Sequence, residues 1–148
     1  FTVADQRTYL PDLTPADGPI TKRKLGRSGR RDAEHALRLA REVSRLDIGQ
    51  TVIVKDGVPV AVEAMEGTDE AIRRAAALAG AGIVVAKAAR EDHDFRFDVP
   101  TVGLDTIAVL IETEAAALVV EAGRTFVLDR EELAAQADEN GLAILAAT

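Results

Sequence analysis

The sequence predicts an α/β domain built on a mixed sheet with helices; an α+β arrangement is the alternative. Three observations favour the α/β domain. Valine-rich runs flank an Asp-Gly step in "TVIVKDGVPVAVEA", helical stretches that end at glycines follow such runs, and the order strand, strand, helix, strand occurs twice. We therefore expect two hairpin-helix-strand units.

The composition of the chain excludes several classes of protein. The chain has 148 residues and 47% hydrophobic content, which suits one well-buried core. It has no cysteine and only 2 histidines, so disulfides are excluded and any metal would be held mainly by oxygen. The net charge of -7 argues against a nucleic-acid surface. Without a long apolar run or a leader segment, we expect a cytoplasmic protein.

Residues 1–28 are predicted to form a connector or arm, because they contain several prolines and show little periodicity. The basic "TKRK" at 21–24 is typical of a solvated surface, and contact with a phosphate is the alternative. Residues 29–148 form the predicted domain. Its first helix is expected over 31–46, where apolar residues recur at helical spacing.

The first unit begins with a hairpin, because Asp56-Gly57 supplies the two positive φ angles that a tight turn needs. Thr68 is then expected to cap a helix that continues to Ala79. Glycines follow that helix as stop signals, and "GIVVAKAA" reads as an apolar strand.

The second unit repeats this order. The segment "ALVVEAGRTFVLD" predicts a hairpin around Gly123, "REELAAQADENG" a helix that stops at Gly141, and "LAILAA" a closing strand. A helix over 104–114 is expected to link the units. Aligning Gly57 with Gly123 suggests an internal duplication.

The segment "VEAMEGTDEAIRR" is rich in acids around one Gly-Thr step. Free N–H groups at a helix start attract anions, so Gly67 and Thr68 could hold a phosphate, with Arg73 or Arg74 reaching around it. The alternative is ordinary helix capping by the same residues.

Acids of the same segment offer the hard oxygen ligands that magnesium prefers, although no spacing is diagnostic. They are Glu63, Glu66 and Asp69.

A second candidate segment is "EDHDFRFDVPTVGLDTI", where a strand gives way to a loop. Asp98 could bind a metal or position a water there, while Arg96 or Lys87 neutralises phosphate charge. In the alternative, Asp98 caps a turn and Arg96 pairs with a neighbouring acid.

The blocks "DIGQ", "KDG", "EGTD", "RFDVP" and "EAG" follow one another in this order. Together they resemble the C-terminal domain of the bacterial UDP-2,3-diacylglucosamine pyrophosphatases of the alphaproteobacterial type. The resemblance covers nearly the whole chain, and the opening "TYLPDLTPADGPITKRK" is similar to the segment that enters this domain.

The resemblance implies a magnesium-dependent hydrolase of lipid A biosynthesis in Gram-negative bacteria. Water would attack the α-phosphorus of UDP-2,3-diacylglucosamine and release UMP and the diacylated sugar 1-phosphate. Family members carry an N-terminal nucleotide-fold-like domain, absent from this chain, and the amphiphilic substrate lies between the domains. Peripheral contact with the inner membrane and a homodimer stay open, whereas nucleic acid is not expected as a partner.

The resemblance places the family's catalytic aspartate at Asp98, where it would hold magnesium or orient water. It assigns the other expected metal ligands and substrate contacts as follows: Glu63, Glu66 and Asp69 as ligands; Gly67, Thr68, Arg73, Lys87 and Arg96 as contacts.

A second hypothesis is a non-catalytic module that binds lipid and dimerises, with the chemistry supplied by the missing domain. Exposed hairpin edges could then pair across a two-fold axis. A nucleotide- or metabolite-binding regulator is the third reading.

Overall fold

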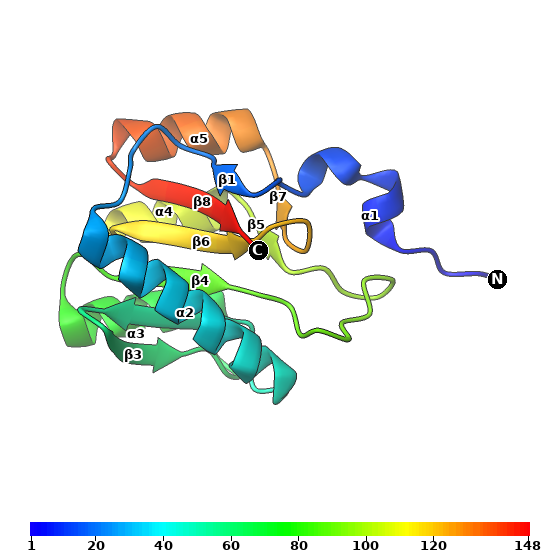
Figure 1. The fold of residues 1–148 in the computed structure, drawn as a ribbon, viewed down its shortest axis with the longest axis horizontal. Helices are drawn as coiled ribbons and strands as arrows, with labels where there is room; N and C mark the ends of the chain where they lie inside the picture. Colours follow the sequence, from blue (N-terminus) through cyan, green and yellow to red (C-terminus); the bar gives the residue numbers. More distant parts are fainter.

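The computed structural model describes residues 1–148, and it confirms the mixed α/β fold (Figure 1). A six-stranded sheet has the order β1-β8-β6-β4-β2-β3, and a two-stranded sheet pairs β5 with β7. The strands are β1 (Gly18–Pro19), β2 (Thr51–Lys55), β3 (Val58–Val62), β4 (Val84–Lys87), β5 (Thr101–Val102), β6 (Ala117–Glu121), β7 (Phe126–Val127) and β8 (Ala143–Ala147).

The directions of the strands place the carboxyl ends of several strands at one edge of the large sheet. β4, β6 and β8 are parallel, β2 is antiparallel to β4, and β3 is antiparallel to β2. The carboxyl ends of β3, β4, β6 and β8 therefore lie at the same edge. In open α/β sheets, ligands bind outside this edge.

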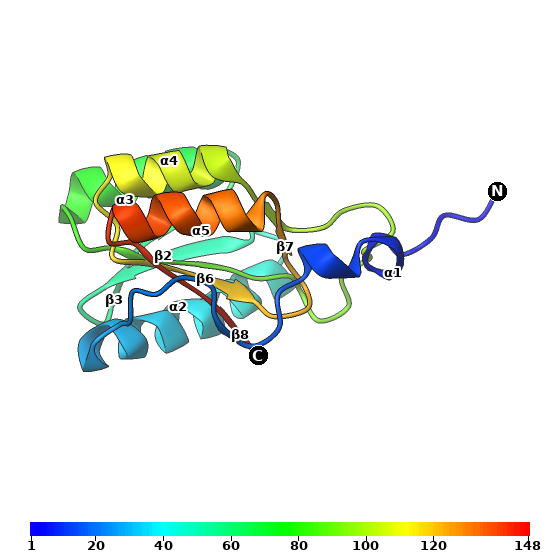
Figure 2. The ribbon, with the colours of Figure 1, turned by 90° about the horizontal axis from the view of Figure 1, so that it is seen from above.

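The helices divide unequally between the two faces of the sheet. They are α1 (Gln6–Tyr9), α2 (Arg27–Arg45), α3 (Thr68–Ala79), α4 (Leu104–Glu112) and α5 (Arg130–Glu139), with a short 3₁₀ helix at Pro11–Leu13. Figure 2 shows α3, α4 and α5 on one face and α2 alone on the other.

The two faces bury separate cores, because successive side chains of a strand point to opposite faces. Ile53 and Val85 pack under α3, α4 and α5, whereas Val52, Val54 and Val84 pack against α2. The strands are thus apolar on both sides, as the continuous valine-rich runs indicate.

The first predicted hairpin is confirmed. β2 and β3 are joined by Asp56 and Gly57, whose φ angles are 50° and 79°. Both amides donate to the buried carboxylate of Asp32 on α2, at 2.9 and 2.8 Å. The turn is therefore fixed to the helix before it. The helix of this unit also has the expected limits, except that Gly67, and not Thr68, is its N-cap.

The second predicted hairpin is wrong. β6 lies between β4 and β8, so both of its edges are already paired. The chain turns at Gly123 and β7 pairs in parallel with β5 instead. The following helix and closing strand are confirmed as α5 and β8, but the two units differ in topology.

Residues 1–28 contain more structure than an extended arm. α1 lies beside the loop after β4, where the Gln6 amide donates to the Phe95 carbonyl at 3.4 Å. β1 pairs with the last strand through Gly18 and Pro19, and so adds an outer strand to the large sheet.

Candidate functional site

One part of the site forms where β4 ends beside the start of α3. The Lys87 Nζ donates to Thr68 Oγ1 at 3.2 Å and to the Thr101 carbonyl at 3.1 Å. Thr68 Oγ1 in turn donates to Glu63 Oε1 at 3.1 Å. The strand end, the helix start and the end of β3 are thereby linked through side chains.

Charge reinforces this grouping. Burial lowers the pKa of Lys87 from its ordinary value, while the negative charges of Glu63, Asp69 and Asp98 act in the opposite direction. Asp69 also accepts a hydrogen bond from Thr106 at 3.2 Å. The partly buried Lys87 ammonium therefore sits in the field of three of the four predicted metal-binding acids. We call Glu63, Thr68, Asp69 and Lys87 the Lys87 cluster.

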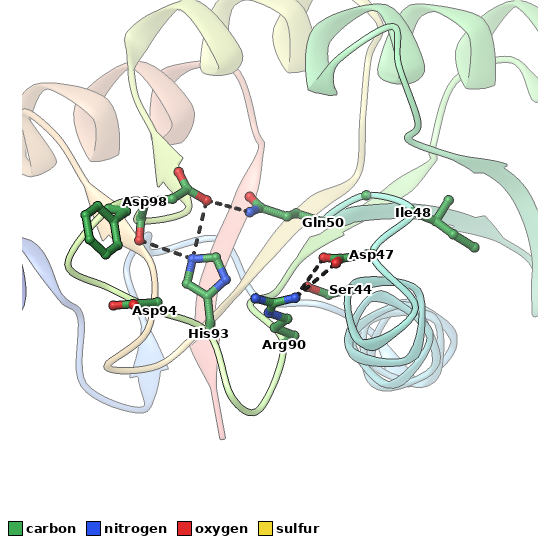
Figure 3. Close-up of a pocket in the computed structure, with 10 residues that line it drawn as sticks. Ser44, Asp47, Ile48, Gln50, Arg90, His93, Asp94 and Asp98 are labelled. Atoms are coloured by element: carbon green, nitrogen blue, oxygen red, sulfur yellow. Dashed lines mark hydrogen bonds and ion pairs between the residues drawn. The ribbon is translucent and has the colours of Figure 1, made fainter.

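The other part is the long loop over residues 88–100, which carries Asp98 (Figure 3). The side chain of Asp98 is 62% exposed. Its Oδ2 accepts from Gln50 Nε2 at 3.1 Å and lies 3.3 Å from His93 Nε2. The same His93 nitrogen lies 3.1 Å from the Asp98 carbonyl oxygen. A solvent-facing carboxylate is thus held from two sides.

Gln50 joins the two parts. Its side chain contacts Asp98, and its backbone N–H donates to Glu63 Oε2 at 3.4 Å. Sequence reasoning missed both Gln50 and His93 as site residues. Gln50 stands in the block "DIGQ" and His93 two residues before Phe95, but only the fold brings them to Asp98.

A cavity of about 460 Å³ opens between the end of α2 and this loop. Gln50, His93 and Asp98 line it, together with Asp47 and Arg90, which form an ion pair at 3.0 Å. In Figure 3, dashed lines join Asp98 to Gln50 and to the His93 ring, and the ion pair of Arg90 with Asp47 lies to the right of that ring. Ile48 and Phe97 are the hydrophobic residues among the ten that line the cavity.

The base of the loop is anchored on a buried carboxylate. Glu121, at the end of β6, has a side chain that is 8% exposed. It accepts from the Ala89 amide at 3.1 Å, Arg41 Nε at 2.8 Å and Arg124 Nε at 3.1 Å. Arg124 also donates to the carbonyls of two loop residues. The sheet edge therefore fixes where the loop starts.

The middle of the loop is anchored by an aromatic ring. Phe95 is buried, and the guanidinium carbons of Arg7 and Arg124 lie 3.6 and 5.0 Å from its centroid. The His93 ring contacts the Phe95 ring edge at a centroid distance of 4.9 Å. The N-terminal segment thus packs on the loop that holds Asp98, which orders it further.

Four predicted site residues take no part in these contacts: Glu66, Gly67, Arg73 and Arg96. Arg73 pairs with Glu70 at 2.6 Å and with Glu112 at 3.6 Å. Glu66 pairs with Arg74.

Arg96 pairs with Asp94 at 2.7 Å, so its pairing with a neighbouring acid is confirmed. Gly67 precedes α3 with φ 86°, and α3 has no side-chain cap. Roles in substrate binding for Gly67, Arg73 and Arg96 stay predictions.

The acids do not form a ready metal centre. No group of three or more Asp, Glu or His side chains is placed to hold a metal ion. Glu63, Asp69 and Asp98 each accept hydrogen bonds from protein groups, and the negative charges of all three act on Lys87. The predicted magnesium ligands therefore do not fit a magnesium site among themselves.

Comparison with known proteins adds independent information. Residues 16–145 match the family described as the LpxI C-terminal domain. Over 154 aligned residues the chain is 38% identical to the UDP-2,3-diacylglucosamine pyrophosphatase LpxI of Caulobacter vibrioides. The alignment covers 98% of this chain and 55% of that relative, so the chain spans about half the length of the curated relative. None of the helices combines the length and the apolar character that crossing a membrane requires.

Proposed function

Because the chain belongs to the LpxI C-terminal domain family, we propose that it forms one half of an enzyme that hydrolyses UDP-2,3-diacylglucosamine. Water attacks the α-phosphorus, the bond from that phosphorus to the bridging oxygen breaks, and UMP and 2,3-diacylglucosamine 1-phosphate are released. The reaction belongs to lipid A biosynthesis in Gram-negative bacteria. The segment that precedes this domain in the relatives supplies the other wall of the substrate cleft.

The observation that carries this proposal is the exposed Asp98 carboxylate held by Gln50 and His93 beside the Lys87 cluster. A fixed carboxylate can orient the attacking water and accept its proton. The carboxylate oxygen that contacts neither partner is free for that task. The carboxylate and the phosphate are both negative and repel each other, so a positive charge must lie nearby to offset the repulsion.

Lys87 supplies that charge. Its ammonium sits at the start of α3, whose first N–H groups have no side-chain cap, so a nonbridging phosphate oxygen can meet both. Charge that develops on these oxygens in the transition state would be stabilised by a group that is already in place. Thr68 holds the Lys87 amino group in this position.

Magnesium dependence is also part of the proposal, as a property of the longer protein. The residues of this chain do not gather into a metal centre, so no step is assigned to the ion.

The test is hydrolysis of UDP-2,3-diacylglucosamine by the chain alone and by the chain combined with the preceding segment of its relatives. Each mixture is assayed in magnesium and in chelator. Activity only with both parts present is expected, with loss of activity in chelator. No hydrolysis by two folded parts together would overturn the enzyme proposal and favour the lipid-binding module.

A further inference from the structure

Six basic residues crowd into positions 22–31, in a chain that carries an excess of acids. All six are exposed, and none takes part in an ion pair. Arginines at the site and on α3 behave differently, since Arg73, Arg74, Arg90 and Arg96 all pair with acids. We call the six residues the basic segment: Lys22, Arg23, Lys24, Arg27, Arg30 and Arg31.

An apolar groove adjoins the basic segment. A cavity of about 370 Å³ lies between this segment and β1 and β8, and half of its 12 lining residues are hydrophobic. Leu25 and Leu145 are partly buried there, with Arg23, Lys24 and Arg30 at the rim. The groove exists because α2 alone covers this face of the sheet (Figure 2).

The positive surface continues along α2. Arg27, Arg31 and Arg38 are exposed and fall on one stripe of the helix, because their spacings are close to whole numbers of turns. Arg45 continues the stripe but pairs with Glu42 at 3.0 Å, and the exposed Glu34 also lies on it. α2 is 19 residues long, so this stripe extends for roughly 27 Å. It runs from the basic segment to the end of the helix that borders the Asp98 cavity.

The chemistry of this surface favours one class of anionic partner. Nucleic-acid surfaces combine basic residues with aromatic rings that stack on bases, and all five aromatic residues of the chain lie outside the basic segment and its groove. Basic residues beside aliphatic surface are instead suited to the anionic headgroups and acyl chains of a phospholipid membrane.

We propose that the basic segment, its groove and the arginine stripe of α2 bind the surface of a membrane containing anionic phospholipids. The partner is inferred in part from the proposed function, because a diacylated substrate resides in a membrane. With α2 lying along the membrane plane, the cavity that holds Asp98 is also close to that plane.

The experiment is co-sedimentation of the longer protein with vesicles of phosphatidylglycerol and phosphatidylcholine, or of phosphatidylcholine alone, over a series of salt concentrations. Binding only to the anionic vesicles is expected, and it should weaken with salt because exposed charges are screened. The variant Lys22→Gln, Arg23→Gln, Lys24→Gln should bind at least about tenfold more weakly, since each basic residue near an anionic surface contributes several-fold in affinity.

The matched control removes the same charge from the opposite face: Arg73→Gln, Arg74→Gln, Arg130→Gln. It should bind within about twofold of wild type. Equal loss in both triple variants, or no binding by wild type, would overturn the proposal. Tighter binding to a single-stranded RNA than to anionic vesicles, abolished by the first triple variant, would identify a nucleic-acid surface instead.

Hydrolysis assays separate this proposal from the proposed function. The first triple variant should cleave detergent-dispersed substrate at the wild-type rate and vesicle-embedded substrate more slowly. If wild type cleaves neither form, the proposed function is wrong, and the vesicle-binding comparison still decides whether this surface binds membranes.

Discussion

Asp98 is the residue whose setting departs most from that of an ordinary surface acid. One carboxylate oxygen is held by Gln50 and lies beside His93, while the side chain as a whole stays 62% exposed. Surface carboxylates usually pair with a mobile cation or with water. Here the amide and imidazole fix the orientation of the carboxylate, which is what a group that positions water needs.

We expect Asp98→Asn in the longer protein to abolish turnover and to retain substrate binding. The amide keeps the shape of the side chain but cannot accept a proton from water, and general-base catalysis typically contributes 10²- to 10⁴-fold in rate. Steady-state kinetics and equilibrium binding of the substrate measure the two effects. Turnover near the wild-type rate would show that Asp98 is not the catalytic base.

His93 is a positioning residue in this scheme, because it contacts Asp98 and not the reacting atoms. His93→Ala should lower kcat by more than about tenfold, since displacement by about 1 Å can be that costly. His93→Gln can place an amide nitrogen near the same Asp98 oxygens and should recover most of the rate. Thermal melting controls for folding. Equal loss in both variants with unchanged stability would contradict the positioning role.

Asp94 and Arg96 provide a test of charge pairing on the loop. Hydrogen bonds from the Arg96 side chain lower the pKa of Asp94 to about 2 from its usual value of 3.8. Since the folded-state pKa is the lower one, the pair contributes stability above about pH 3.8, and that contribution is lost as the pH falls toward 2.

The expected result is a carboxyl titration of Asp94 by NMR with a midpoint near pH 2 in wild type. In Arg96→Gln the midpoint should return toward 3.8. A midpoint near 3.8 already in wild type would mean that Arg96 is free of Asp94 in solution, and available for phosphate.

At the scale of elements, the connection between α2 and β2 depends on close backbone contact. Gly49 lies against the end of β3, and a Cβ added there would be 2.1 Å from the Glu63 carbonyl oxygen. Gln50 follows immediately, so this contact also sets the position of the residue that bridges the two parts of the site.

Gly49→Ala should therefore lower the free energy of unfolding by about 1–3 kcal/mol, the usual cost of overpacking. Urea denaturation measures the loss. Gly29→Ala is the matched control, because the only close approach of its new Cβ, 2.9 Å, is to the movable Cδ2 of Leu25, and alanine has a higher helix propensity than glycine. A Gly49→Ala protein as stable as this control would show that the contact relaxes without cost.

The pairing of β5 with β7 illustrates why a correct local pattern can mislead. Phe126 and Val127 do form a strand after a turn at Gly123, as the pattern indicates. Their partner is decided by the occupancy of neighbouring edges, and β6 has both edges filled. A glycine between two apolar runs therefore predicts a turn more reliably than it predicts a hairpin.

At the scale of the whole molecule, the outer strands of the large sheet affect whether two copies of the chain can pair edge to edge. β1 has two residues, and β3 contains Pro59, which lacks an amide proton, beside a shift in register. Short edges, proline and irregular register all oppose pairing with another sheet. We expect static light scattering to report a monomer for this chain. A dimer would favour the alternative of an assembly module and would require an interface other than these edges.

The sequence by itself determined most of what depends on neighbouring residues. Asp56-Gly57 encodes a turn, glycines end α3 and α5, and continuous apolar runs encode the strands, because each depends on local backbone preference. The ordered blocks likewise identified the family, whereas the catalytic role that they imply for Asp98 stays a prediction.

Only the tertiary structure decided which distant groups meet. Gln50 reaches Asp98 across 48 positions, His93 turns back onto the same carboxylate, and Lys87 comes to lie among acids from three segments. Such contacts follow from strand order and loop path, which local propensity does not specify. Glu63, Asp69 and Asp98 thus lie where their charges act on the partly buried Lys87 ammonium, and their role as metal ligands stays a prediction.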